Sequence, residues 1–221
     1  MRLCVAVYSA HMNSEAPRVI PILSAALQDR IKDPRTGEGA QRRAAEIQAA
    51  LGRPEVHARR AGLLRVATDP RSSTDARYAA LRQLADLFVE AAKGIAPCRS
   101  GCTHCCHIPV AMAPSEARVI ARATGRALSK RGVKLAARGV GRTEYGYETP
   151  CPFLKEGGCS IYAVRPIACR ALISLDGDDL LCRLVPGASI QVPYLNLSDL
   201  QMLLATLALG EGLADIRDFF P

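Results

Sequence analysis

The sequence predicts a mainly α-helical fold, in which a helical scaffold surrounds a loop-rich region dense in cysteine. Three observations support this prediction. Aromatic residues make up only 5% of the chain and tryptophan is absent, so a core of aliphatic helices is expected. Apolar residues recur at helical spacing before and after the centre of the chain. Eight of the nine cysteines fall within one segment, residues 98–182.

Helix signals run through most of residues 14–93. Ser14 is a candidate N-cap for a first helix, and the glycines at 37 and 39 are expected to interrupt the helical run. Later, Ser72-x-x-Asp75 resembles a capping box, in which a serine and an acidic side chain satisfy the free amides of a helix start. The helices predicted after the glycines cover 40–51, 54–66 and a segment from this box to just before Gly94.

After the first cysteines, residues 108–112 are expected to be extended or to form a turn. Pro114 suits the first position of a helix that reaches about residue 132, and Glu116 lies near the positive end of its dipole. Residues 134–149 are polar and rich in glycine, which predicts a loop. A second box, Ser198-x-x-Gln201, precedes a strongly apolar helix that we interpret as part of the core.

The cysteines lie in two groups, and such density indicates either a disulfide framework or a metal site. No signal peptide and no apolar run of about 18 residues is found, so a cytoplasmic location without membrane association is expected. Disulfides are rare in that compartment. The cysteine count is also odd, and two cysteines are adjacent in sequence. Metal ligation is therefore the leading interpretation, with disulfides as its alternative.

The spacing Cys98-x3-Cys102-x2-Cys105 places three thiolates on one tight loop, where Gly101 permits a turn. Zinc and iron–sulfur clusters are both held by four thiolates. Adjacent residues are expected to project apart, so Cys106 either serves a second centre or lies outside the first. Eight thiolates could supply two four-sulfur centres, although the spacing does not assign them. The predicted ligands are Cys98, Cys102, Cys105, Cys106, Cys151, Cys159, Cys169 and Cys182.

Several side chains beside these cysteines have two interpretations. His104 and His107 could replace a cysteine ligand or donate a hydrogen bond to a sulfur. Arg165 and Arg170 flank Cys169 and could stabilise thiolates, or they could form ordinary ion pairs. The remaining candidates, which we interpret as packing or surface residues, are Tyr162, His57, His11 and Cys4.

The order of these features predicts three regions: a helical N-terminal region (1–97), a cysteine-cluster metal-binding region (98–182), and a C-terminal helix (183–221) that packs on the same domain. The net charge of +8 is diffuse, with no basic run longer than two residues, which disfavours nucleic acid as a partner without excluding it. Bound thiolates would offset part of this charge. The expected partner is a metal ion or cluster, and a protein partner stays open.

Taken together, the motifs resemble the YkgJ-type cysteine-cluster family (CxxCxxCC), which is described as zinc- or iron-chelating. The resemblance rests on the cysteines of 98–106, the acidic helix start at 113–117, Cys-Pro-Phe-Leu at 151–154, and Cys-x-Ile-Tyr-x-x-Arg-Pro-x-x-Cys-Arg at 159–170. It covers roughly residues 98–182. A distant similarity to the cysteine-rich region of flagellin lysine-N-methylase implies an iron–sulfur centre, but the chain has no usual glycine-rich nucleotide loop.

The leading functional hypothesis is a metalloprotein that binds an iron–sulfur (4Fe-4S) centre or iron for redox or protein-modification chemistry. The first alternative is a structural zinc module that supports protein or nucleic-acid interaction. The second is metal storage or delivery through exchangeable thiolates. No catalytic residues and no organic cofactor site are identified, so whether the protein is an enzyme stays open.

Overall fold

The computed structural model describes residues 23–139 and 146–221. Ser14, Cys4 and His11 lie outside the described residues. The described part is mainly α-helical, as predicted, and no helix in it is long and apolar enough to cross a membrane. Its elements are the α-helices α1 (Ala25–Lys32), α2 (Pro34–Leu51), α3 (Pro54–Thr68), α4 (Thr74–Ala91), α5 (Pro114–Thr124), α6 (Lys130–Arg138), α7 (Ile167–Ala171), α8 (Ser198–Ala208) and α9 (Ile216–Phe219), the strands β1 (Ala111–Met112), β2 (Leu154–Lys155), β3 (Gly158–Cys159) and β4 (Ala214–Asp215), and the 3-10 helices η1 (His104–His107), η2 (Tyr162–Val164) and η3 (Leu180–Cys182).

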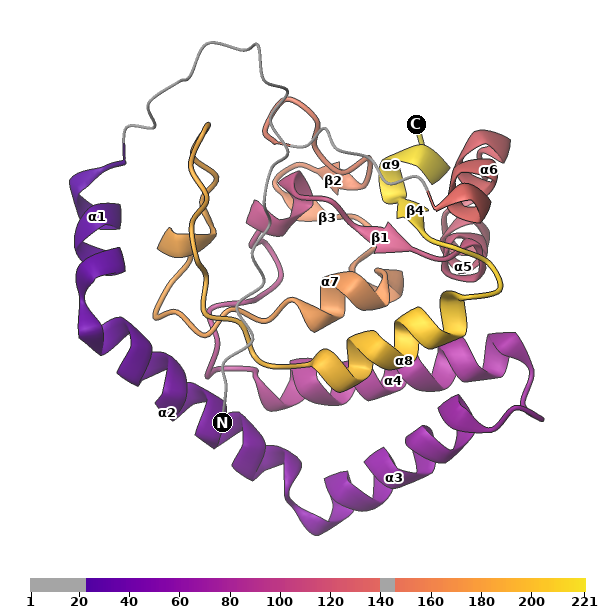
Figure 1. Cartoon of the computed structure of the whole chain (residues 1–221), viewed down its shortest axis with the longest axis horizontal. Helices are drawn as coiled ribbons and strands as arrows, with labels where there is room; N and C mark the ends of the chain where they lie inside the picture. The colour runs from indigo at the N-terminus through magenta and orange to yellow at the C-terminus, as the bar shows by residue number, and fades with distance from the viewer. Residues whose placement is uncertain (1–22, 140–145) are drawn as a thin grey trace.

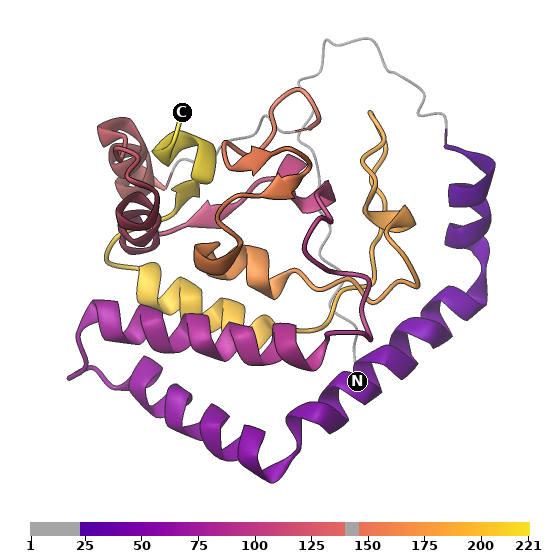
Figure 2. The same cartoon turned by 180° about the vertical axis from the view of Figure 1, so that it is seen from behind.

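The helices enclose the cysteine loops from two sides. Helices α1, α2 and α3 form an outer frame, and α4 lies between α3 and α8 (Figure 1). Helices α5, α6 and α9 lie together at the end of the molecule away from α1, as the reverse view also shows (Figure 2). The loops that follow α4 and flank α7 lie between these two sets of helices.

Helix α2 begins earlier than the glycines predict. Asp33 caps it, because its side chain accepts a hydrogen bond from the Arg35 amide at 2.9 Å, and Pro34 occupies the first turn. Gly37 and Gly39 are therefore helical, which corrects the predicted interruption. Glycine within a helix costs about 1 kcal/mol relative to alanine, and burial of the apolar face offsets this cost. The buried residues of that face are Ala40, Ala44, Ile47 and Leu51.

Both predicted capping boxes are displaced. The N-cap of α4 is Ser73, whose hydroxyl accepts from the Ala76 amide at 3.2 Å, so the predicted Ser72 is one residue early. Ser198 is the first residue of α8 rather than its cap, and its amide donates to the Asn196 side chain at 3.1 Å. In both cases the helix is where the apolar spacing predicts it, and only the polar residue that starts it differs.

The helix predicted from residue 114 to about 132 is two helices. Gly125 ends α5 in the left-handed region with φ 68°, and Gly139 ends α6 in the same way with φ 65°. Residues 134–138, predicted as part of a loop, belong to α6. Ala127 and Leu128 continue the apolar spacing of α5 after Gly125, so the sequence pattern does not reveal the break.

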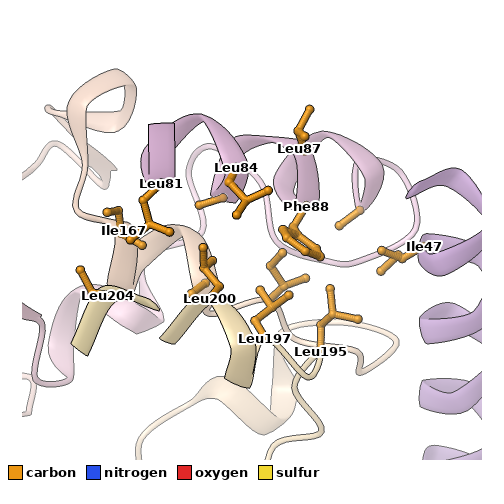
Figure 3. Packing of buried hydrophobic residues seen from close by; sticks show 14 of the residues in the cluster. Ile47, Leu81, Leu84, Leu87, Phe88, Ile167, Leu195, Leu197, Leu200 and Leu204 are labelled. Carbon is orange, nitrogen blue, oxygen red and sulfur yellow. The ribbon is translucent and has the colours of Figure 1, made fainter. Parts of the chain in front are cut away.

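The main hydrophobic cluster packs α4 against α2, α7 and α8. The cluster contains residues from all three predicted regions, 1–97, 98–182 and 183–221. The division of the chain into these regions stays a prediction. Removing such side chains from water is the principal stabilising contribution to a fold of this kind. The residues labelled in Figure 3 are Ile47, Leu81, Leu84, Leu87, Phe88, Ile167, Leu195, Leu197, Leu200 and Leu204.

A second cluster joins the C-terminal residues to the cysteine region. Strand β1 pairs antiparallel with β4, with Ala111 opposite Asp215, so residues more than a hundred positions apart lie side by side. Phe219 and Phe220 are buried in this cluster together with Cys106 and Cys151. Helix α8 is partly a core helix, as interpreted from the sequence, although Met202 and Leu209 on it are exposed.

Candidate metal centre

The first cysteine group lies on a tight loop after α4. Gly101 adopts φ 90°, a conformation that side chains disfavour, so the predicted turn at this glycine is confirmed. The chain then enters η1, where the Cys106 amide donates to the Thr103 carbonyl at 2.8 Å. Within this short segment Cys98 is exposed and Cys106 is buried. The group thus extends from the surface into the second hydrophobic cluster.

The second group is carried by three different elements. Cys151 precedes the β2–β3 hairpin, and Cys159 is paired with Leu154 in that hairpin. Cys169 lies in the middle of α7, and Cys182 is the last residue of η3. All eight cysteines of the described residues are free thiols, so no disulfide joins them there. The disulfide alternative is not supported by this arrangement.

The two groups meet at several points. The Cys151 amide donates to the Cys106 carbonyl at 2.7 Å, which joins the two segments through their backbones. Cys98, Cys102, Cys105 and Cys182 line one cavity of about 100 Å³. A smaller cavity of about 40 Å³ is lined by Cys169 together with the first three of these cysteines. The structure therefore brings the two sequence groups together, as the prediction of a shared site requires.

Cys105 and Cys106 are neighbours in η1, and each thiol changes the pKa of the other. The Cys106 thiol lowers the pKa of Cys105, and the positive charge of Arg165 adds a smaller effect in the same direction. The Cys105 thiol, together with desolvation, raises the pKa of Cys106. The expectation that the two side chains project apart stays a prediction.

The other six thiols have raised pKa values, and desolvation is the largest cause in each case. Hydrogen bonds oppose this effect: the Ser174 amide donates to the Cys98 sulfur at 3.3 Å, and backbone amides do the same for three others. Thiolates so placed are costly without a partner, and a bound cation would remove that cost. The six thiols are Cys98, Cys102, Cys151, Cys159, Cys169 and Cys182, the last with a pKa of about 12.

Four of the cysteines line a common cavity, but the side chains are not arranged as a finished metal site. Within residues 23–139 and 146–221, no three His, Cys, Asp or Glu side chains are placed as ready-made ligands of one metal ion. A tetrahedral zinc site needs sulfurs about 3.8 Å apart, given a zinc–sulfur bond of about 2.3 Å.

The two histidines have other partners. His104 lies 3.0 Å from the Asp179 carboxylate through its Nε2 atom and also lines the larger cavity. The His107 ring packs at a tilt against the Tyr147 ring, with 4.7 Å between the ring centroids, and its Nδ1 atom is buried without a hydrogen-bond partner among the described residues. Neither contact is evidence that a histidine binds metal. Both histidines remain candidates for residues that surround a metal centre.

The two arginines have different roles. Arg165 lies over the Tyr162 ring, 4.0 Å from its centroid. Its charge contributes to the lowered pKa of Cys105, and it opposes the larger effect of desolvation on the pKa values of Cys98, Cys159 and Cys169. Arg170 is 5% exposed, forms an ion pair with Asp86 of α4, and donates to the Arg165 carbonyl at 3.0 Å. Arg165 is thus the cation beside the sulfurs, while Arg170 fixes the segment that carries it.

A buried pair outside the predicted site residues holds the two groups together. Arg217 donates to the carbonyls of Cys106 at 3.0 Å and Thr149 at 2.7 Å, and it forms an ion pair with Asp215 at 3.0 Å. Asp215 in turn accepts from the Val110 amide at 2.7 Å. Nothing in the sequence pattern indicates this role, because a single Asp-x-Arg near residue 220 matches no motif and lies far from the cysteines.

Glu116 links α5 to the helix that carries Cys169. Its carboxylate accepts from the Ile167 amide at 2.8 Å and from the Ala113 amide at 3.4 Å, and the residue is 3% exposed. Desolvation raises its pKa. Glu116 therefore does more than favour the start of α5, since it also satisfies the first free amide of α7.

Replacing Glu116 with alanine should lower the free energy of unfolding by about 3 kcal/mol, because two buried amides lose their acceptor at about 1–3 kcal/mol each. Chemical denaturation measures this change. The matched control is Glu55→Ala, because Glu55 is an exposed glutamate in the first turn of α3; it should change stability by no more than about 0.5 kcal/mol. Equal effects of the two substitutions would contradict this role of Glu116.

Comparison with known proteins places the cysteine region in a family. Residues 97–183 match the CxxCxxCC family, whose description is "putative zinc- or iron-chelating domain". The matched segment contains all eight clustered cysteines, so the family predicted from the motifs is confirmed. No curated protein and no solved structure matches the chain, and the similarity to flagellin lysine-N-methylase is not shown.

Proposed function

We propose that the protein binds iron as an iron–sulfur centre, because residues 97–183 match the CxxCxxCC family, whose description is "putative zinc- or iron-chelating domain". The observation that carries this proposal is the placement of four thiols around a cavity of about 100 Å³, where Cys98, Cys102, Cys105 and Cys182 are all part of the lining. Four thiolates are the usual ligand set of such clusters. When bound, the cluster would supply one-electron redox chemistry.

The surroundings of the cavity suit a negatively charged cluster. Arg165 provides a positive charge beside the sulfurs, and the Ser174 amide donates to Cys98. Charge and hydrogen bonds to sulfur both stabilise a reduced cluster. Cys98 is exposed, so the site reaches the surface, as electron exchange with a protein partner requires. Free thiols also suit a reducing compartment such as the cytoplasm.

Anaerobic purification followed by metal and sulfide analysis tests this function. We expect stoichiometric iron and acid-labile sulfide, with broad absorption in the visible range. Colourless protein with tightly held zinc would instead support the structural zinc module, and variable, readily exchanged metal would support storage or delivery. Either of these two results would overturn the iron–sulfur proposal.

Substitution of single cysteines tests the ligand assignment. Cys102→Ala and Cys169→Ala should each remove the metal centre to which that cysteine contributes, whereas Cys4→Ala should leave the metal content unchanged, since Cys4 lies outside the matched segment. The measurement is iron per folded chain by elemental analysis, with circular dichroism to confirm folding. Unchanged metal in both of the first two variants would falsify the assignment.

A further inference from the structure

We infer that the eight cysteines form two separate four-sulfur sites. The first site consists of Cys98, Cys102, Cys105 and Cys182. The second site consists of Cys106, Cys151, Cys159 and Cys169. The inference rests on the proposed function, because it assigns the ligands of the metal proposed there, and it goes beyond that function by giving the number of centres and the membership of each.

The first site is defined by the cavity of about 100 Å³, which all four of its sulfur-bearing residues line. The sulfur of Cys182 interacts electrostatically with Cys98, Cys102 and Cys105, although about eighty residues separate it from them in sequence. Ser174 lies between the loop that carries Cys98 and the segment that carries Cys182, because its amide donates to the Cys98 sulfur and its side chain acts to lower the pKa of Cys182. These contacts turn the four thiols towards one space.

Helix α1 packs against the segment that carries Cys182, residues 174–182. Arg30 of α1 forms ion pairs with two aspartates of this segment, at 2.6 Å to Asp176 and 2.9 Å to Asp178. Leu27 of α1 packs against Leu181 in a small hydrophobic cluster. None of these contacts involves the residues of the second site. The first site can therefore be disturbed through Arg30 without removal of any ligand.

The second site lies in the other hydrophobic cluster. Cys106 and Cys151 are buried in it, and Cys159 and Cys169 pack against it. The Cys151 amide bonds to the Cys106 carbonyl at 2.7 Å, and the β2–β3 hairpin returns Cys159 towards Cys151. Each of Cys106 and Cys169 interacts electrostatically with both Cys151 and Cys159. The Arg217–Asp215 pair anchors this site, since it holds the Cys106 carbonyl.

The two sites meet at the peptide bond between Cys105 and Cys106. Cys105 interacts electrostatically with Cys106, Cys159 and Cys169, so it is the member of the first site that faces the second. Cys169 is its counterpart, because it lines the smaller cavity of about 40 Å³ together with Cys98, Cys102 and Cys105, and Cys105 is the thiol with the largest effect on it. We assign Cys169 to the second site, since it packs, as Cys159 does, against the hydrophobic cluster in which Cys106 and Cys151 are buried.

The test compares Cys182→Ser with Cys159→Ser, one substitution in each site, under anaerobic conditions. Iron and sulfide per chain are measured, and electron paramagnetic resonance of the reduced protein identifies each centre. We expect each variant to lose about half of the wild-type iron and a different one of two signals. Cys169→Ser should lose the same signal as Cys159→Ser. Loss of the signal that Cys182→Ser removes would overturn the assignment of Cys169.

Two measurements do not depend on the stability of a cysteine variant. The wild-type protein alone should contain two centres per chain, and a single centre would overturn the inference. Arg30→Ala should selectively weaken the signal that Cys182→Ser removes, with Arg35→Ala as the control because Arg35 forms its ion pair with the nearby Asp33 on the surface. An equal loss of both signals in Arg30→Ala would count against separate sites.

The inference and the proposed function fail in distinguishable ways. Wild-type protein with a single iron–sulfur centre, all of which is lost in both Cys182→Ser and Cys159→Ser, would overturn the two-site inference and leave the proposed function intact. Wild-type protein that contains zinc or no metal would overturn the proposed function, and the two-site inference, which rests on it, would be overturned as well.

Discussion

Replacing Arg217 with alanine should destabilise the protein by about 3–5 kcal/mol, because the substitution leaves Asp215 as an unpaired buried charge. The side chains of these two residues are 5% and 4% exposed. The carbonyls of Cys106, Ile108 and Thr149 would also lose their donor. We therefore expect a loss of metal as well as of stability, since Cys106 and the segment before Cys151 would no longer be held together.

Denaturant titration of the purified protein measures the stability, and elemental analysis measures the metal. Arg217→Lys keeps the positive charge but lacks the planar guanidinium group that donates to several carbonyls at once. Its loss of stability and of metal should therefore be intermediate. Arg35→Ala is the control, since the Arg35 side chain is 83% exposed, and a change within about 0.5 kcal/mol is expected. An Arg217→Ala protein with wild-type stability and metal content would refute the role given to this residue.

Gly212→Ala should have the second large effect. Gly212 adopts φ 72° shortly after α8, and a Cβ atom there would overlap the carbonyl oxygen of Ala136 in α6. The left-handed conformation costs a side chain about 1–2 kcal/mol, and overpacking adds about 1–3 kcal/mol. We expect a loss of roughly 2–5 kcal/mol in the free energy of unfolding.

A matched control lies two residues earlier. A Cβ atom at Gly210 would meet no neighbouring atom within 4 Å, and the backbone there is outside the left-handed region. Gly210→Ala should therefore change stability by less than about 0.5 kcal/mol. Thermal unfolding of both variants provides the comparison. If Gly210→Ala were as destabilising as Gly212→Ala, the close approach of α6 to this turn would not be the cause.

The sequence predicts the positions of helices well where apolar residues recur on one face. It predicts their first and last residues less well, because single polar or glycine residues set those boundaries. The spacing of apolar residues locates α3, α4 and α8. It misses the break at Gly125 because apolar residues continue beyond it. It also gives too much weight to Gly37 and Gly39, since the burial of α2 against α4 outweighs the intrinsic cost of glycine.

For the candidate site too, the sequence predicts features that depend on neighbouring residues and misses those that depend on residues far apart in the chain. Cysteine density and spacing indicate metal chelation, because thiolates are common ligands of zinc and of iron–sulfur clusters. The opposite shifts in the pKa values of Cys105 and Cys106 could not be predicted, since they depend on how η1 places the two thiols. Arg217 and Arg30 could not be found either, because each acts on the cysteine loops from a distant part of the sequence.

The pairing of β1 with β4 has a consequence for synthesis on the ribosome. Ala111 can meet Asp215, and Arg217 can reach the Cys106 carbonyl, only after translation has passed these late residues. A nascent chain that already contains all eight clustered cysteines therefore still lacks Arg217, which joins the Cys106 carbonyl to the Thr149 carbonyl just before Cys151. Insertion of metal should consequently be a late, post-translational event, and the unfinished polypeptide would need protection of its sulfurs from oxidation until then.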